Sequence, residues 1–242
     1  MISYRADAIL VFTAAIAFAA GPFISSFDGF DPNAYPLPQD SPPAQPAGYA
    51  FAIWGPIYLW LLASTGFGLF ARADDPDWTA TRPPLFISLA IGSIWLPVAE
   101  VSPIWATVLI WAMLVTALIA LLRTPQKDLW LLRAPIGLYA GWLTAASSVS
   151  IALLGAGYGV AFSQVTWAVI AISIAFVIAI NMILTRKAPG TYVFAIAWAL
   201  VGLVVQNMTT IPMIAALAAI GAVTLATLFV SVTRKAETGA QA

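Results

Sequence analysis

The chain is dominated by eight long apolar stretches, which polar or Pro- and Gly-rich breaks separate. They lie near 6–24, 48–71, 83–101, 103–123, 131–154, 163–185, 190–207 and 210–233. About 20 helical residues cross the hydrocarbon core of a bilayer, and only the stretch at 190–207 is marginal by that measure. Strands of a membrane barrel would be shorter and would alternate apolar with polar residues. The sequence therefore predicts an all-α integral membrane protein, a bundle of about eight transmembrane helices.

The composition removes several classes of function. Apolar residues make up 62% of the chain and charged residues only 8%, against about 25% charged in soluble domains. Cys and His are both absent, which removes disulfides, thiol catalysis, thiolate metal sites and the commonest general base. Ten basic residues balance ten acidic ones, so nothing indicates a nucleic-acid partner. We expect a lipid bilayer as partner, no metal and no required cofactor, and we favour a binding protein while leaving enzyme activity open.

The basic residues predict the orientation, because cytoplasmic loops are enriched in Lys and Arg. With the N-terminus inside, all ten fall on the inner side: Arg5, Arg72, Arg82, Arg123, Lys127, Arg133, Arg186, Lys187, Arg234 and Lys235. Both termini are therefore expected in the cytoplasm. An alternative is that the first apolar stretch is a signal peptide, whose removal would leave seven helices. The stretch continues through Phe23 and Ile24, which favours a retained helix.

The predicted outer loop at 25–47 differs from the rest of the chain. It contains six prolines together with Asp28, Asp31 and Asp40. Repeated proline blocks regular helix and stiffens the backbone. Two interpretations stay open at this point: a semi-rigid connector, and a lid over an outward-facing cavity.

The ten tryptophans are unevenly placed in this topology. An aromatic belt would populate both membrane interfaces. Five tryptophans instead fall in the outer half of their helices and two near the middle: Trp54, Trp95, Trp105, Trp111, Trp167, Trp142 and Trp198. Large aromatic side chains fill bundle cores, and they also line pockets for flat apolar ligands. Both explanations remain open for each tryptophan.

Two further features of the predicted helices carry expectations. Glu100 lies near the outer end of a predicted span, and carboxylates within spans are candidates for function. We treat Glu100 as a candidate proton or polar site, the alternative being that it only reaches the interface. Gly137, Gly141 and Ala145 recur every four residues, a small-residue stripe that favours close approach of another helix.

The second apolar stretch contains a recognisable pattern, from Pro46 to Tyr58: PAGYAFAIWGPIY. Together with Trp95-x-Pro97 and Trp142-x-x-x-Ala146, this pattern resembles the tryptophan-rich sensory protein family (TspO/MBR, translocator-protein-like). The resemblance covers about residues 6–160 in the family's helix order. It indicates a TspO/MBR-like five-helix domain at 1–160, including the loop at 25–47, and additional transmembrane helices with a short cytoplasmic tail at 161–242.

The sequence also departs from the family. Tyr49 stands where the family has its first aromatic residue of the motif. Gly92 replaces the family's Asn before the third-helix tryptophan, and Ala99 and Glu100 replace its Phe pair.

The resemblance implies a pocket within the first five helices, capped by the first long loop. Family members bind porphyrins such as protoporphyrin IX, haem-pathway intermediates or sterols. The residues carried over as ligand-binding are Tyr49, Phe51, Trp54, Tyr58, Trp95, Tyr139, Trp142 and Ala146. Trp54 and Trp142 would flank the ligand, Ala146 would leave room for it, and Tyr49 would sit under the loop.

The expected function is therefore that of a membrane protein that binds a flat hydrophobic ligand and acts in sensing, regulation or trafficking. The resemblance and the basic-residue bias place it in a bacterial inner membrane. Three rivals stay open: a secondary transporter with Glu100 as coupling site, an enzyme acting on a lipid or porphyrin, including light-driven oxidation through tryptophan, and a structural partner in a membrane complex. The ligand's identity is open, as is a homodimer.

Overall fold

The computed structural model describes residues 4–25, 31–125, 127–185 and 188–239. The long helices of this part are α1 (Tyr4–Ile24), α2 (Trp54–Phe70), α4 (Arg82–Val101), α5 (Pro103–Leu122), α6 (Ala134–Gly157), α7 (Gln164–Leu184), α8 (Gly190–Asn207) and α9 (Pro212–Gly239). Four short elements join them: η1 (Pro32–Ala34), η2 (Gly48–Ile53), α3 (Pro76–Thr79) and the π-helical η3 (Leu129–Arg133). Eight helices among the described residues are long and apolar enough to cross a membrane. The chain is an integral membrane protein, and the predicted all-helical bundle is confirmed.

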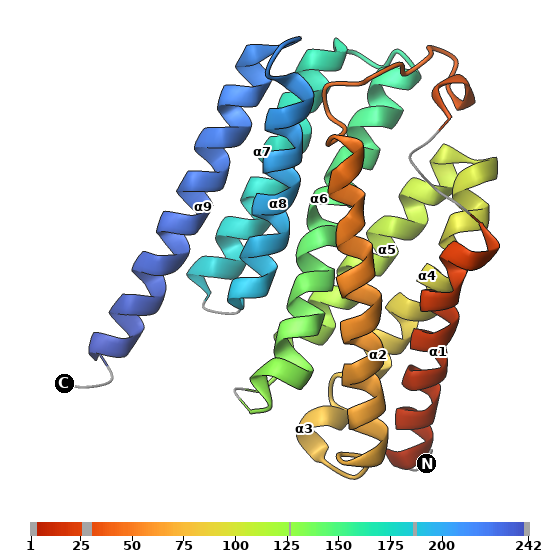
Figure 1. Cartoon of the computed structure of the whole chain (residues 1–242), viewed down its shortest axis with the longest axis vertical. Coiled ribbons are helices and arrows are strands. Elements are labelled where there is room, and N and C mark those ends of the chain that lie inside the picture. The colour runs from red at the N-terminus through yellow and green to blue at the C-terminus, as the bar shows by residue number, and fades with distance from the viewer. Residues whose placement is uncertain (1–3, 26–30, 126, 186–187, 240–242) are drawn as a thin grey trace.

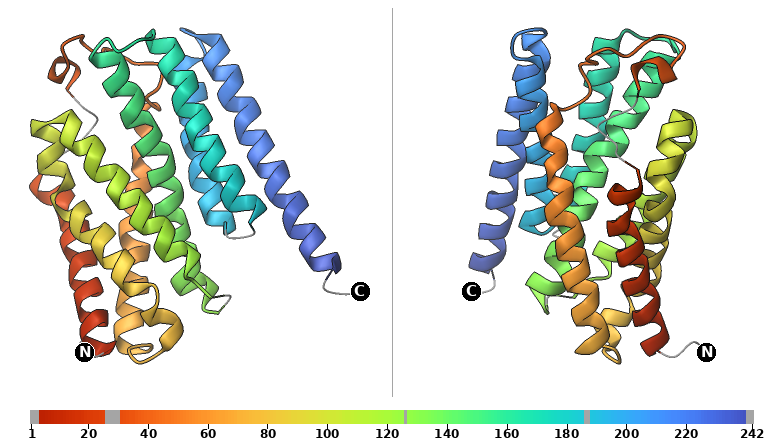
Figure 2. Two further views of the ribbon diagram at one scale, coloured as in Figure 1. Left: turned by 180° about the vertical axis from the view of Figure 1, so that it is seen from behind. Right: turned by 45° about the vertical axis from the view of Figure 1, so that its right-hand side comes forward.

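Helix α6 is the central helix of the bundle. It packs against α2 and α5 on one side and against α7 and α8 on the other, and α9 lies outermost against α7 and α8. Of the spanning window that includes α6, 83% is buried, against 28% for α9. Figure 2 shows the same bundle from behind and in an oblique view. Helix α6 is buried on all sides, so its apolar residues follow no period that would distinguish a core face from a lipid face. Its central position could therefore not be predicted from the sequence.

Helices α4 and α5 form a tight hairpin with Ser102 and Pro103 at its turn. Ser102 ends α4 in an extended conformation and caps α5, its hydroxyl accepting a hydrogen bond from the Trp105 N–H at 3.3 Å. Pro103 occupies the first position of α5, where its missing N–H costs no intrahelical bond. The turn therefore needs no additional residues between two spanning helices.

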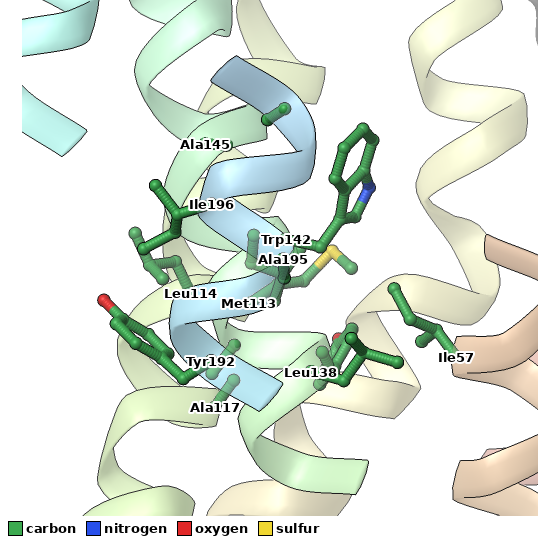
Figure 3. Packing of buried hydrophobic residues seen from close by; sticks show 14 of the residues in the cluster. Ile57, Met113, Leu114, Ala117, Leu138, Trp142, Ala145, Tyr192, Ala195 and Ile196 are labelled. Carbon is green, nitrogen blue, oxygen red and sulfur yellow. The ribbon is translucent and has the colours of Figure 1, made fainter. Parts of the chain in front are cut away.

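The small-residue stripe of α6 brings α8 into close contact. A Cβ atom at Gly141 would lie 2.3 Å from the Tyr192 carbonyl oxygen and 3.0 Å from the Ala195 Cβ. A Cβ atom at Gly137 would meet Pro189 at 2.3 Å. Tyr192 and Ala195 lie in the packed core next to α6 (Figure 3). The small-residue stripe therefore packs α6 against α8, and helix packing is the role that the stripe predicts.

The proline-rich segment is fastened to α6 and α8 at the end of the bundle that the basic residues predict to face outward, which we call the outer end. The Leu37 N–H donates to the Gly157 carbonyl at 2.9 Å, and the Ala47 N–H donates to the Gly202 carbonyl at 3.1 Å. The buried Asn207 amide donates to the Pro43 carbonyl at 3.0 Å. Residues 31–47 therefore form an anchored connector over α6–α8, while Asp28 lies outside the described residues.

Most of the described charged residues lie at the end of the bundle that the basic residues predict to be cytoplasmic, which we call the inner end. Helix α1 begins and α9 ends at this same end (Figure 1). The Arg72 guanidinium bonds Asp128 at 2.8 Å, and the Trp78 indole N–H donates to the same carboxylate at 2.9 Å. These two hydrogen bonds hold the pKa of Asp128 below its usual value, because they stabilise its charged form. The cluster ties the α2–α3 connection to the α5–α6 loop.

Buried Arg82 closes the end of α2 beside this cluster. Its guanidinium donates to the carbonyl oxygens of Gly68, Arg72 and Ala73 at 3.2, 2.7 and 2.7 Å. These carbonyls belong to the last turn of α2 and the residues after it, where a helix has no backbone donors left to offer. Eight of the ten basic residues lie at this end of the described chain, and Arg186 and Lys187 lie outside the described residues.

Candidate functional site: an aromatic cavity between α1, α2, α4 and α5

A cavity of about 750 Å³ lies between four helices of the N-terminal part of the bundle. Its volume is within the range of pockets that take small-molecule ligands. Helix α1 contributes one wall, η2 and α2 a second, and α4 with α5 the third. The lining residues include Phe18, Pro22, Ser25, Phe51, Trp54, Gly55, Tyr58, Leu59, Gly92, Trp95, Leu96 and Met113.

The wall formed by α2 is an aromatic platform. Trp54 and Tyr58 are one helical turn apart, so they share a face. Their rings stack, with centroids 5.4 Å apart and 16° between the planes. Phe18 of α1 meets both rings edge to face, at 5.8 Å from Trp54 and 4.9 Å from Tyr58. A flat apolar molecule would find a preformed stacking surface here.

A smaller cavity of about 50 Å³ lies on the far side of Phe51 and Trp95, which line both spaces. Trp142 and Ala146 of α6 line the small cavity, together with Pro46 of the outer connector. Trp142 is only 2% exposed, and its indole N–H is one of the buried donors in the described chain without a hydrogen-bond partner. Leaving such a donor unpaired costs about 1–3 kcal/mol. The ring of Trp142 points away from Tyr192 in the core (Figure 3).

The eight residues carried over from the family pattern are only partly brought together. Phe51 and Trp95 line both cavities, Trp54 and Tyr58 line the large one, and Trp142 and Ala146 line the small one. Trp54 and Trp142 contact each other edge to face at 6.1 Å. A flat molecule placed between these two indoles would require them to separate.

Two of the eight lie outside both cavities. Tyr139 is fully buried behind the platform, where its hydroxyl is 2.9 Å from the Ser88 hydroxyl and its ring packs against Phe18. Tyr49 is 43% exposed and packs edge to face on Trp198 of α8. Tyr49 therefore lies beside α8, and its place under the outer connector stays a prediction. A role in ligand binding stays a prediction for all eight residues.

The third wall and α1 supply residues that the sequence did not single out as ligand-binding. Phe18 of α1 contacts the platform although no motif marks it. Gly92, noted only as a departure from the family, lets Phe18 approach α4, since a Cβ atom there would meet the Phe18 ring at 2.6 Å. The partners of Phe18 lie on α2, α4 and α6. Because these contacts join residues that are far apart in the chain, no local sequence pattern reveals them.

The C-terminal helices hold the entrance to α2 in place. The Trp198 indole N–H donates to the Ala50 carbonyl at 2.9 Å. A Cβ atom at Gly202 would lie 2.8 Å from the Pro46 Cβ and 3.0 Å from the Ala50 Cβ, so α8 approaches η2 closely. Because η2 carries Phe51, α8 helps to position a residue shared by both cavities.

Glu100 lies at the outer end of α4 and is exposed. Its carboxylate accepts a hydrogen bond from the hydroxyl of Ser25, which lines the large cavity. The structure therefore places Glu100 at the outer edge of the cavity. A coupling role for Glu100 in transport stays a prediction.

The chain also matches a known protein family. The model of a family described as TSPO-like protein matches residues 38–231. The matched region includes η2, α2 and the lining residues of α4, α5 and α6, and it extends through α7 and α8 into α9. Comparison with curated proteins and with solved structures finds no match. The division of the chain at residue 160 stays a prediction.

Proposed function

The chain belongs to the TSPO-like protein family, and on this premise we propose that it binds a flat hydrophobic ligand, of the porphyrin or sterol type, within the membrane. The observation that carries the proposal is the cavity of about 750 Å³ with an aromatic platform in its wall. Trp54 and Tyr58 place two flat aromatic rings in this wall, and such a ligand could stack on them. Family membership alone supports a membrane ligand-binding protein of unspecified ligand.

The walls of the cavity support a hydrophobic ligand in particular. Phe18, Phe51, Leu59 and Met113 present carbon atoms to the space, and apolar ligands gain free energy in proportion to the apolar area they remove from water. The Trp95 indole N–H in the wall is already satisfied by the Ala106 carbonyl at 2.8 Å. Shape and stacking would therefore dominate recognition along the walls.

The biological role that fits such a protein is sensing, regulation or trafficking of the ligand. A binding role needs no acid–base or nucleophilic residue, and this fits a chain without His, the commonest general base, and without Cys. If the ligand is a porphyrin, light absorbed by the pigment would supply the energy for any photo-oxidation, dissolved dioxygen would be the oxidant, and nearby tryptophans would be reaction partners. We place the protein in a bacterial inner membrane with both termini in the cytoplasm, and a homodimer is compatible with this role.

The proposal is tested by titrating the purified protein in detergent micelles with protoporphyrin IX and, separately, with the fluorescent sterol dehydroergosterol. Saturable quenching of tryptophan fluorescence by at least one of them, with a dissociation constant well below millimolar, is the expected result. Empty micelles at the same detergent concentration provide the control for partitioning. Quenching that stays linear with both compounds would contradict ligand binding of this type.

A further inference from the structure

The outer edge of the cavity is polar, unlike its walls. On α4, Gly92, Leu96 and Glu100 are spaced by four residues and share one face of the helix. Gly92 and Leu96 line the cavity, so Glu100 continues the lining face by one turn toward the outside. On α1, Phe18 and Pro22 lead along the cavity wall to Ser25 in the same way. The two faces end in the Ser25–Glu100 hydrogen bond.

The described charged side chains at this end of the bundle are all acidic. Apart from Glu100 they are Asp31 and Asp40, which are exposed and line neither cavity. The described Lys and Arg residues lie at the opposite end, where α1 begins and α2, α5 and α9 end. No described basic side chain is therefore placed to neutralise a negative group at the cavity's outer edge. A ligand carboxylate brought next to the Glu100 carboxylate would therefore meet a like charge, and like charges repel each other.

We propose that Glu100 selects the polar end of the ligand: a hydroxyl or ammonium group, which donates a hydrogen bond to the carboxylate, is favoured over a carboxylate. The Ser25 hydroxyl uses one acceptor position of Glu100, and a carboxylate has further acceptor positions on its two oxygens. The inference rests on the proposed function, because it concerns a ligand already stacked in the cavity. It makes flat molecules with donor ends, such as sterol alcohols or amine-bearing polycycles, better candidates than free porphyrin diacids.

The test compares two ligands that share one ring system. Protoporphyrin IX ends in two carboxylates, and its diamide with ethylenediamine ends in two ammonium groups. Both are titrated into detergent-solubilised wild type, Glu100→Gln and Asp40→Asn, following the porphyrin absorption band. Glutamine keeps the size of Glu100 and an oxygen that accepts from Ser25. Asp40→Asn removes the same charge at the same end of the molecule, from an exposed residue that lines neither cavity.

Wild type is expected to bind the diamine about tenfold or more tightly than the diacid, equivalent to about 1.4 kcal/mol. Glu100→Gln is expected to remove most of this preference, and Asp40→Asn to leave it nearly unchanged. Suppose that both porphyrins bind saturably and that Glu100→Gln leaves the ratio of their dissociation constants as in wild type. Selection by Glu100 is then contradicted, whereas ligand binding in the cavity is not. An equal loss in Asp40→Asn would also contradict it, because net charge would then explain the preference. If neither porphyrin binds and dehydroergosterol also fails, the proposed function is wrong, and this inference falls with it.

Discussion

Replacing Gly141 with valine is expected to lower the thermal unfolding midpoint of the detergent-solubilised protein by roughly 5–10 °C. A Cβ atom at this position would lie 2.3 Å from the backbone oxygen of Tyr192. A backbone atom inside a helix cannot move aside alone, so α8 must shift as a unit away from α6. That shift would also loosen the Thr144–Tyr192 hydroxyl contact of 3.1 Å. The midpoint is measured by following intrinsic fluorescence or light scattering during heating.

Gly55→Ala is the matched control for this substitution. A Cβ atom at Gly55 meets nothing within 4 Å, and alanine is a better helix former than glycine by about 1 kcal/mol. The control is therefore expected to leave the midpoint unchanged or to raise it slightly. An unchanged midpoint in Gly141→Val would show that α6 and α8 do not pack as closely as described.

Trp54→Ala is expected to weaken binding of the ligand about 30-fold or more. Truncating a buried aromatic anchor at the centre of a binding site commonly costs about 2 kcal/mol or more. Here the substitution removes half of the stacked Trp54–Tyr58 pair and the edge contact that Phe18 makes with it. The dissociation constant is best taken from the ligand's own absorption or fluorescence, because the substitution removes a tryptophan signal.

The control for this experiment is Trp105→Ala. Trp105 is 63% exposed on α5 and lines neither cavity, so its loss is expected to leave the dissociation constant within about twofold. Equal weakening in both variants would point to a general loss of folded protein. No weakening in Trp54→Ala would remove the platform from the binding site.

The spans of the helices could be read from the sequence because lipid imposes a length and an apolar composition on each of them. The apolar stretch predicted at 48–71 corresponds to η2 followed by α2. The helix predicted at 131–154 begins earlier, with a π turn at Leu129, and ends later, at Gly157. Such boundaries depend on local capping and on tertiary contacts. The π turn precedes Pro135, and the Asp128 backbone before it adopts a left-handed conformation with φ of 50°.

The site was predictable where it is local in sequence. Phe51, Trp54 and Tyr58 lie within eight residues, and one stretch of chain places all three on the cavity. The contribution of α1 was not predictable, since Phe18 reaches the site through contacts with three distant helices. The outer segment could be recognised as stiff from its prolines, but its attachment to α6 and α8 depends on single hydrogen bonds, such as that from Asn207 to Pro43.

The most direct test of the central claim asks whether the ligand occupies the cavity between α1, α2, α4 and α5. The natural chain has no cysteine, so Gly55→Cys introduces a single thiol at the cavity, at a position where a Cβ atom meets nothing within 4 Å. Val108→Cys, on an exposed part of α5 that lines neither cavity, serves as the matched control. The rate of modification by a small maleimide is measured with and without saturating ligand. We predict that the ligand slows modification at position 55 about tenfold or more and leaves position 108 unaffected. Equal rates at position 55 with and without a ligand that binds saturably would place the binding site elsewhere and contradict the account.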